Sequence, residues 1–409
     1  MNVSRFWISD RRTFMSYAVA AASTMLMARP GLAGSVQPHA DPRGAPPPGK
    51  TPEQLEALAG PLEPGAKELY ERAIVIDSLG GIGGPSFSDD RDTSKGLLIP
   101  EELAAVRASG VTAVNLTLSR PTFDATMRNL DAWRAEIAKH PDYLTQALRP
   151  EDILAAKQAG KLAVIIGYQG LDMIENDMAR IDASYDAGVR IMQLSYNKHN
   201  LLAAGSLDPI SKGLTPFGRD VVARINQLGA TVDVSHGNMR VAIDTAAASK
   251  KPIAITHTGA RAIYDHPRNL PDEALTAVTR RGGVVGIYLV PFLGLDPIDA
   301  TRRILVRHLD HALKICGEDH VGIGTDVDTM PIDYTPEYLK ALEKFGVQRR
   351  KEGIATPLET GRLMGVPELN FPRKLQYIAS DLLKAGYSSR VVEKVLGGNF
   401  LRLFQETWT

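Results

Sequence analysis

Two histidines and one aspartate, His236, His257 and Asp326, each stand at the end of a short run rich in Val and Ile. Two neutral imidazoles and a carboxylate suit Zn²⁺ or another divalent first-row metal. An aspartate beside a metal-bound water can act as a general base. A single histidine at a strand end is more often a structural residue. Three such residues at matching positions favour a functional site with one divalent metal.

An arginine follows the second histidine within a short segment, His266-Pro267-Arg268-Asn269-Leu270. The planar guanidinium fork of arginine binds a carboxylate through two hydrogen bonds. If this segment faces the same site, Arg268 would bind a carboxylate of the substrate. The alternative is a salt bridge on the surface.

Apolar runs alternate with amphipathic stretches along the chain, and we expect them to form the strands and helices that carry these residues. The runs cover residues 73–77, 113–118, 162–167, 191–195, 231–235, 253–256, 284–289 and 321–325. The stretches include residues 51–59, 64–72, 100–109, 124–139, 178–187, 216–228, 240–248, 272–281 and 300–316, and residues 366–409 are mostly helical in pattern. Buried parallel strands are continuously apolar, and eight of them separated by helices indicate a (β/α)₈ TIM barrel.

In such a barrel the chemistry takes place at the carboxyl ends of the strands, which is where the three residues fall. The main alternative is a doubly wound open sheet with a glycine-rich phosphate turn. The run Gly80-Gly81-Ile82-Gly83-Gly84 offers glycines but lacks the GxGxxG spacing and a helix start. The barrel is therefore the predicted fold.

The amino-terminal segment resembles an export signal of the twin-arginine type. Arg11-Arg12 and Phe14 precede an apolar stretch of residues 17–27, and small residues follow near residue 33. We expect a signal peptide over residues 1–33, a Pro- and Gly-rich linker over 34–50, and one catalytic domain over 51–409. The protein would then be periplasmic or exported. The apolar stretch is too short and too often interrupted for a stable membrane span.

Composition excludes several other classes. The chain of 409 residues has 47 Lys+Arg and 47 Asp+Glu, so it lacks the basic excess of a nucleic-acid-binding protein. One cysteine, Cys316, cannot form an internal disulfide framework or a multi-cysteine metal site. We therefore expect a small-molecule substrate and no nucleic-acid partner.

Five segments of the sequence together resemble the membrane (renal) dipeptidase family of metallopeptidases, which are amidohydrolase-type barrels. The segments are residues 232–236, 252–258, 266–272, 322–328 and 397–402. The resemblance implies two zinc ions and hydrolysis of dipeptides. By position it implies that His236 and His257 bind one zinc, that Arg268 with Asn269 binds the substrate carboxylate, and that Asp326 is catalytic. Together with the C-terminal helices it also suggests a homodimer.

The sequence departs from this family at the other zinc. Where the family has Asp-Gly-His-Asn-Asp after the first strand, this chain has Asp77-Ser78-Leu79-Gly80-Gly81, so a histidine and an aspartate ligand are replaced. The glutamate that bridges both metals is replaced by Gln169. Tyr196 stands where a histidine helps to stabilise the transition state, and we expect it to take part in catalysis and substrate binding. A mononuclear site with His236, His257 and Gln169 is therefore expected, most simply with zinc, and a second metal is not.

Three functions stay open at this point. The first is a mononuclear hydrolase that cleaves a dipeptide or an N-acyl amino acid. The second is a metal-poor lyase or isomerase that acts on a small carboxylate. The third is a non-catalytic periplasmic binding protein that keeps the pocket and Arg268. A fold does not determine which of these applies.

Overall fold

The structure is a computed structural model, and it describes residues 49–83, 97–294, 301–357, 359 and 363–408. These residues all belong to one unit of the chain, Ala40–Thr409. The predicted signal peptide and most of the predicted linker lie outside the described residues. Within the described residues, no helix has the length and apolar character that a membrane span requires.

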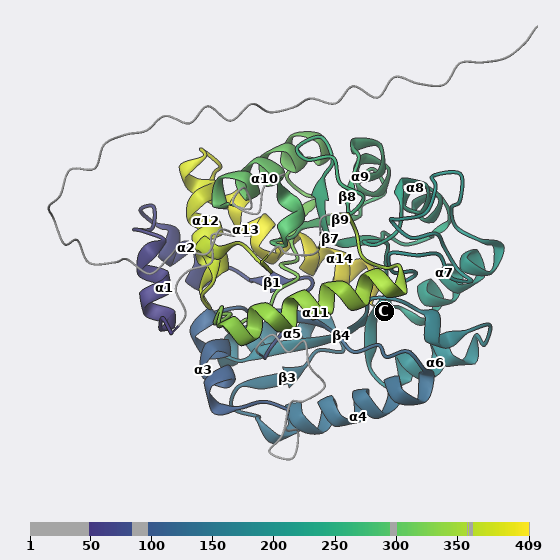
Figure 1. Cartoon of the computed structure of the whole chain (residues 1–409), viewed down its shortest axis with the longest axis horizontal. Coiled ribbons are helices and arrows are strands. Elements are labelled where there is room, and N and C mark those ends of the chain that lie inside the picture. Colours follow the sequence, from purple (N-terminus) through teal and green to yellow (C-terminus); the bar gives the residue numbers. More distant parts are fainter. Residues whose placement is uncertain (1–48, 84–96, 295–300, 358, 360–362, 409) are drawn as a thin grey trace, which may run out of the picture. The chain divides into compact units, whose positions relative to one another are not determined.

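The predicted TIM barrel is confirmed. Eight parallel strands close into a ring, in the order β2-β1-β10-β9-β7-β6-β5-β4 with β4 pairing back to β2 (Figure 1). Their bounds are β1 Ile76–Asp77, β2 Ala113–Thr117, β4 Leu162–Tyr168, β5 Val189–Gln193, β6 Thr231–Asp233, β7 Ala254–Ala260, β9 Val284–Ile287 and β10 Val321–Ile323. Each lies within or beside one of the eight predicted runs. The apolar runs were informative because these strands are buried on both faces.

Two further short strands extend the sheet and were not predicted. The strand β3 (Leu144–Gln146) pairs with β4, and β8 (Asn269–Leu270) pairs with β7. The latter strand is the segment that directly follows Arg268. Pairing with β7 therefore fixes this segment beside the strand that carries His257.

Helices surround the barrel, and several begin at a threonine cap. Their bounds are α1 Pro52–Leu58, α2 Ala66–Arg72, α3 Pro100–Ser109, α4 Phe123–Lys139, α5 Pro150–Ala159, α6 Ala179–Asp186, α7 Pro216–Leu228, α8 Met239–Ala248, α9 Asp272–Thr279, α10 Arg302–Cys316, α11 Pro336–Glu352, α12 Lys374–Lys384, α13 Ser389–Glu393 and α14 Asn399–Thr407. Thr122, Thr215, Thr301 and Thr335 each accept a hydrogen bond from a backbone N–H in the first turn of the following helix. The helices α5 and α11 were not predicted.

The carboxyl-terminal helix packs under the barrel. Phe400 and Phe404 of α14 belong to one apolar cluster with Ile76, Ile165 and Val284 of the strands. The ring of Phe400 lies so close to β10 that a Cβ on Gly322 would meet it at 2.4 Å. The small residue at this position therefore allows the helix to seat against the barrel. At Gly397 the backbone is non-helical (φ 176°, ψ −17°), so a kink within Lys394–Gly398 lies between α13 and α14.

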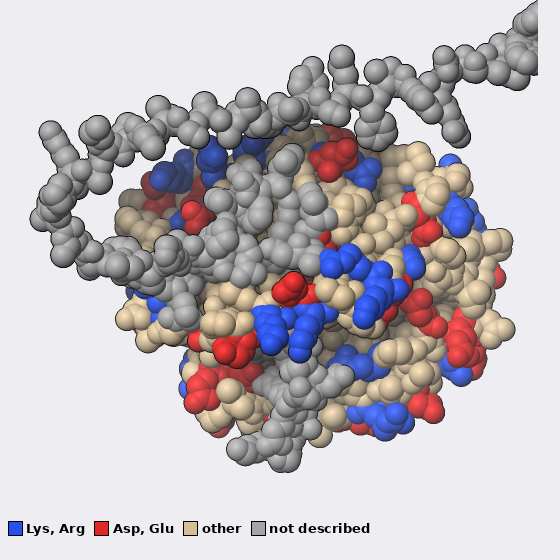
Figure 2. All heavy atoms as spheres, in the orientation of Figure 1, with Lys and Arg blue, Asp and Glu red and all other residues tan. Residues whose placement is uncertain are grey.

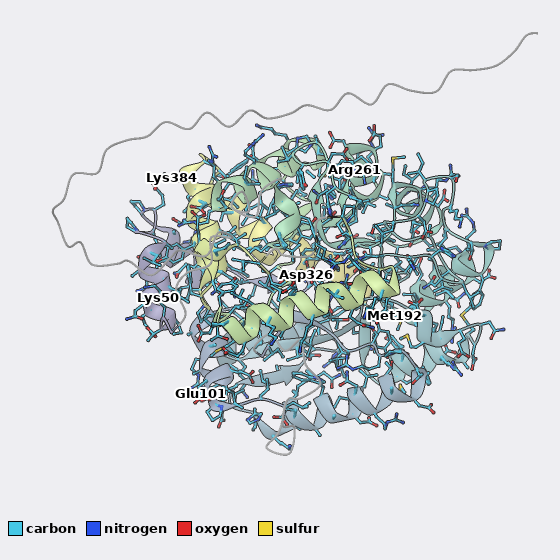
Figure 3. All side chains as sticks on the ribbon, viewed as in Figure 1. Lys50, Glu101, Met192, Arg261, Asp326 and Lys384 are labelled. Atoms are coloured by element: carbon cyan, nitrogen blue, oxygen red, sulfur yellow. The ribbon has the colours of Figure 1, made fainter. Side chains whose placement is uncertain are left out.

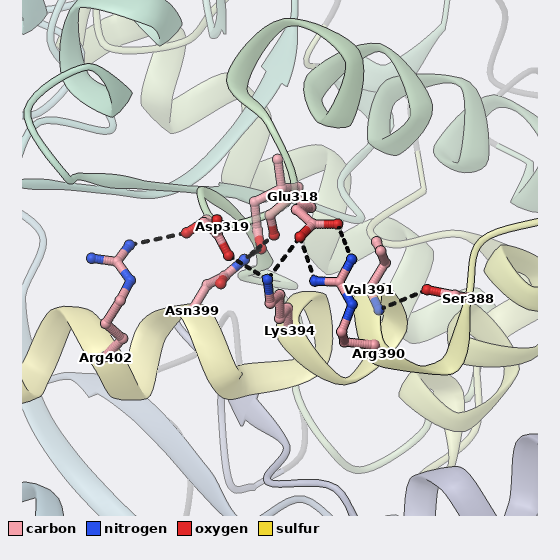
Figure 4. A network of polar contacts seen from close by, with 9 residues as sticks. Glu318, Asp319, Ser388, Arg390, Val391, Lys394, Asn399 and Arg402 are labelled. Atoms are coloured by element: carbon pink, nitrogen blue, oxygen red, sulfur yellow. Dashed lines mark hydrogen bonds and ion pairs between the residues drawn. The ribbon is translucent and has the colours of Figure 1, made fainter.

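A polar network fixes the same carboxyl-terminal segment to the turn that enters β10 (Figure 4). Arg390 and Lys394 both pair with the carboxylate of Glu318, and Lys394 also pairs with Asp319. The two cations lower the pKa of Glu318 to about 2. Asn399 donates to the backbone oxygens of Glu318 and Val321 at 2.8 Å each. The network therefore holds the amino end of the strand whose carboxyl end carries Asp326.

Candidate functional site

Six of the predicted site residues meet at the carboxyl ends of the strands. They are Gln169 after β4, Tyr196 after β5, His236 after β6, His257 in β7, Arg268 before β8 and Asp326 after β10. The rings of Tyr196 and His236 stack with centroids 4.0 Å apart, and those of His236 and His257 are 4.9 Å apart. In Figure 3, Asp326 lies near the middle of the barrel, beside α11 in this view.

The first histidine presents a bare nitrogen to the site. Nδ1 of His236 lies 2.6 Å from Oδ1 of Asn197, and an amide oxygen can only accept, so Nδ1 carries the hydrogen. Nε2 is then the basic nitrogen, and it is buried without a hydrogen-bond partner in the part of the chain that the structure describes. Burial, reinforced by Arg268 and His257, holds the pKa of His236 well below its usual value. The imidazole is therefore neutral, as a metal ligand must be.

The second histidine has the same tautomer, but a longer chain of hydrogen bonds sets it. The hydroxyl of Thr256 donates to Asp233 at 2.6 Å, so its oxygen accepts from Nδ1 of His257 at 2.9 Å. Nε2 faces the site, where the only described contact is the amide nitrogen of Gln169 at 3.4 Å. Burial and Arg268 hold the pKa of His257 well below its usual value. Both imidazoles therefore offer a lone pair to the same space.

One buried aspartate ties the two histidine-bearing strands together. Oδ1 of Asp233 accepts from the backbone N–H groups of Ser235 and Thr256 at 3.0 and 3.1 Å, and from the Ser235 hydroxyl at 2.5 Å. The hydroxyl oxygen of Ser235 in turn accepts a hydrogen bond from the backbone N–H of His257 at 3.1 Å. Burial raises the pKa of Asp233, and these donors oppose that rise. Because Ser235 and Thr256 directly precede His236 and His257, Asp233 positions both imidazoles.

A second buried aspartate, Asp77, helps to position Asp326. Asp77 at the end of β1 accepts from the backbone N–H of Thr325 at 2.7 Å and from its hydroxyl at 2.6 Å. Burial raises the pKa of Asp77 to about 7, against the lowering effect of the Thr325 bonds and of Lys374. The residue that follows, Asp326, has a φ of 56°, which is rare for a non-glycine residue. Its N–H donates to Leu79 O at 2.7 Å. Bonds from β1 thus hold Asp326 in a strained conformation.

The carboxylate of Asp326 is the acid–base candidate of the site. Burial raises its pKa to about 6, although Arg268, Arg349 and a hydrogen bond with Gln169 all lower it. The Gln169 side chain therefore lies between Asp326 and His257. A carboxylate with a pKa near neutrality can both accept and release a proton under physiological conditions.

Arg268 is almost fully buried, with 2% of its surface exposed. Nη1 donates to Ser235 O at 2.6 Å and Nη2 to His257 O at 3.5 Å. No carboxylate among the described residues forms an ion pair with it. A buried charge normally has a partner, and the guanidinium lies beside both histidines. The site is therefore prepared to receive an anionic group at this point.

Asn269, predicted to bind substrate, is placed beside the site but is fully engaged. Its amide nitrogen donates to Tyr264 O at 2.8 Å and to Phe292 O at 2.9 Å, and its oxygen accepts from the Tyr288 hydroxyl. In the structure this side chain holds the segment that carries Arg268. Contact of Asn269 with substrate stays a prediction.

The helix α11 also contributes a residue to the site, which was not predicted. This helix runs across the face of the barrel (Figure 1), and Lys and Arg side chains gather over this region of the surface (Figure 2). The guanidinium of Arg349, in its last turn, lies 5.5 Å from the centroid of the Tyr196 ring and pairs with Glu359. The sequence Thr335-Pro336 and the later Gly353 would indicate a helix. Nothing in the sequence indicates that its last turn reaches Tyr196.

The possible metal ligands among the predicted site residues are two imidazoles and one amide. Two imidazole nitrogens converge, and Gln169 can supply an oxygen if its amide turns toward them. No cluster of three or more His, Cys, Asp or Glu side chains able to hold a metal occurs among the described residues. On the opposite side, Leu79 has no donor atom, and a Cβ on Gly81 would lie 1.6 Å from Oδ1 of Asp328. Neither Leu79 nor Gly81 offers a side-chain ligand, and the space beside Gly81 holds the carboxylate of Asp328.

The chain is similar in sequence to known proteins. A family model described as membrane dipeptidase (peptidase family M19) matches residues 67–346. Dipeptidase tcpJ of Claviceps purpurea is 28% identical over 284 residues, which cover 69% of this chain and 59% of that protein. An uncharacterized protein of the pqqA 5′ region of Klebsiella pneumoniae is 30% identical over 295 residues, which cover 70% of this chain and 97% of that protein. The chain thus spans less than two thirds of the length of the Claviceps relative.

Solved structures show the same fold. An amidohydrolase from Pseudomonas aeruginosa superimposes with a TM-score of 0.70 and 29% identity, over 84% of this chain and 99% of that one. A metallopeptidase from Rhodobacter sphaeroides, liganded with a phosphinate mimic of the dipeptide L-Ala-D-Ala, has a TM-score of 0.66 and 18% identity. That match covers 82% of this chain and all of the other.

Proposed function

Since the chain belongs to the membrane dipeptidase family, peptidase family M19, we propose that it hydrolyses the amide bond of a dipeptide or an N-acyl amino acid with one bound metal ion. The family implies a divalent metal, and zinc is the ion we propose. The observation that carries the proposal is the pair of neutral imidazoles with unprotonated Nε2 atoms, beside a buried arginine that forms no ion pair with a carboxylate among the described residues. Together they support a metal site with an anion site beside it.

Each side chain has a defined part in this reaction. His236, His257 and, with its amide turned, the oxygen of Gln169 would hold the ion, which when bound would polarise the scissile carbonyl and favour attack by water. Asp326 accepts a proton from the attacking water and returns it to the nitrogen of the leaving amino acid. The Tyr196 phenol donates a hydrogen bond to the carbonyl oxygen as negative charge develops there. Water is consumed, and the products are an acid and a free amino acid.

Metal removal tests the proposal directly. The purified protein is expected to contain about one zinc per chain and to release glycine from Ala-Gly. Dialysis against a chelator should abolish the hydrolysis, and one equivalent of Zn²⁺ should restore it. Metal content measured by mass spectrometry and product measured by chromatography provide the readout. A protein that takes up no divalent metal and cleaves no dipeptide would contradict the proposal.

Arg268 is expected to bind the substrate carboxylate. Arg268→Ala should raise KM for Ala-Gly by about 100-fold, since a bidentate charge-assisted pair is lost. Ala-glycinamide, which lacks the carboxylate, should be cleaved with nearly the same KM by wild type and variant. Arg261→Ala is the control, because Arg261 lies on the same loop but pairs with Asp265. An equal loss for the acid and the amide would show that Arg268 acts only on the fold.

Two further proposals concern the location and the oligomeric state of the protein rather than its reaction. The paired arginines and the apolar stretch near the amino terminus support export to the periplasm. The resemblance to the family supports a homodimer. Fractionation of cells that express the whole chain and light scattering of the purified protein would test the two proposals separately.

A further inference from the structure

A cavity of about 380 Å³ opens beside Asp326 at the carboxyl ends of β1, β2 and β10. Much of its wall is apolar, with Leu79 and Ile82 after β1, Leu116 and Leu118 from β2 and its loop, and Trp133 from α4. Its volume falls in the range of small-molecule pockets. It is therefore large enough to receive a substantial side chain or acyl group.

The residues that replace the strand-one metal ligands shape this cavity. Leu79 contributes an apolar side chain to the wall where a histidine would place a polar ring. Gly81 contributes no side chain, and the carboxylate of Asp328 occupies the space that a Cβ there would need. Leu79 thus gives the neighbouring space an apolar wall, and Gly81 leaves room for the carboxylate of Asp328.

The order of strands around the barrel gives the cavity a defined place relative to the substrate. Going round the ring from β7, which carries His257 and pairs with the segment after Arg268, the next strands are β9, β10 and β1. Asp326 follows β10, so it stands between the arginine and the cavity. A substrate with its carboxylate on Arg268 and its scissile bond beside His257 and Asp326 extends its other end, the acyl side, toward β1 and β2.

We propose that this cavity is the acyl-side subsite and that it takes a bulky apolar group attached to the scissile carbonyl. This inference rests on the proposed function, because Arg268 and the histidines set the direction of the substrate. Two sources share the chemistry, namely an amino-terminal residue with a large apolar side chain and an N-acyl group without an ammonium. The cavity border carries two carboxylates, Asp326 and Asp328, and one guanidinium, Arg120. The ammonium is therefore the feature that the experiment must vary.

Three substrates separate these possibilities. Phe-Gly and 3-phenylpropionyl-Gly have the same ring and differ only in the ammonium group, whereas Ala-Gly has the ammonium without the ring. The metal-loaded wild type is expected to cleave both phenyl substrates with a higher kcat/KM than Ala-Gly. A preference for Phe-Gly over 3-phenylpropionyl-Gly identifies the amino-terminal residue as the source, and the reverse preference identifies the acyl group.

Trp133→Ala removes the aromatic wall of the cavity. We expect it to raise KM for the preferred phenyl substrate by about tenfold, the usual worth of an aromatic contact, and to leave KM for Ala-Gly unchanged. Leu116→Trp adds bulk to the cavity from β2 and should act in the same direction. Phe123→Ala is the matched control, because Phe123 is a half-buried aromatic residue of the same helix that does not line the cavity.

Reduced-amide analogues of Phe-Gly and Ala-Gly, with CH₂–NH in place of the amide, separate binding from turnover. Calorimetry on the metal-loaded protein should show tighter binding of the phenyl analogue, and Trp133→Ala should remove that difference. Equal affinities for the two analogues, or a Trp133→Ala variant that folds and keeps the difference, would overturn the subsite. Absence of any hydrolysis would count against the proposed function alone, because the binding difference does not depend on turnover.

Discussion

Asp326→Asn is expected to lower kcat for dipeptide hydrolysis by about 100- to 10,000-fold, the range for loss of a general acid–base group. Asparagine has the same shape but cannot accept the proton from water. The substitution suits the backbone, because asparagine is among the non-glycine residues that most readily adopt the left-handed conformation seen at this position. The metal content and KM should therefore stay near the wild-type values. Steady-state kinetics and metal analysis on the same preparation measure both.

Asp310→Asn is the control for this prediction. Asp310 lies on α10, where it pairs with Lys314 and accepts from Tyr387, and it takes no part in the site. Its substitution should leave kcat unchanged. If Asp326→Asn kept the wild-type kcat, Asp326 would not be the acid–base group. If wild type and variant were both inactive while the reduced-amide analogues still bound, a binding protein would be the better description.

Asp233→Ala is expected to destabilise the protein by about 3 kcal/mol or more and to weaken metal binding by about 10- to 100-fold. The substitution leaves two backbone N–H groups and two hydroxyls buried without their acceptor. The hydroxyl of Thr256 then no longer has the carboxylate that orients it toward His257. Urea denaturation measures the free energy of unfolding, and a competition titration with a zinc indicator measures the metal affinity.

A surface aspartate gives the comparison for this effect. Asp182 pairs with Arg224 at 2.6 Å, and both side chains are more than one third exposed. Asp182→Ala should cost less than about 1 kcal/mol, as for most exposed ion pairs, and it should leave metal affinity unchanged. A similar small loss for Asp233→Ala would mean that water or a shifted loop replaces the carboxylate. The two imidazoles would then be held mainly by the strands.

The barrel and the position of the site residues at its strand ends could both be predicted from the sequence. Strands buried on both faces must be apolar along their whole length, so the eight runs were visible without any contact information. Residues at the carboxyl ends of parallel strands lie at the same edge of the sheet. The sequence therefore predicted that His236, His257 and Asp326 lie together at one end of the barrel. The loss of ligands at Leu79 and Gly81 was also readable, because a side chain without a donor atom cannot bind a metal wherever it lies. At Gln169 the sequence shows a neutral amide in place of a carboxylate.

The hydrogen-bond partners of these side chains, and the residues packed around them, became known only from the three-dimensional structure. The bond between Asp77 and Thr325 joins residues 248 positions apart, and Arg349 reaches Tyr196 from a helix whose sequence shows only ordinary start and stop signals. Asn269 is engaged by three protein groups rather than open to the site. The cavity behind Asp326 forms where three loops and α4 meet. Such contacts form only when the barrel closes. A local sequence pattern does not show which distant segments then become neighbours.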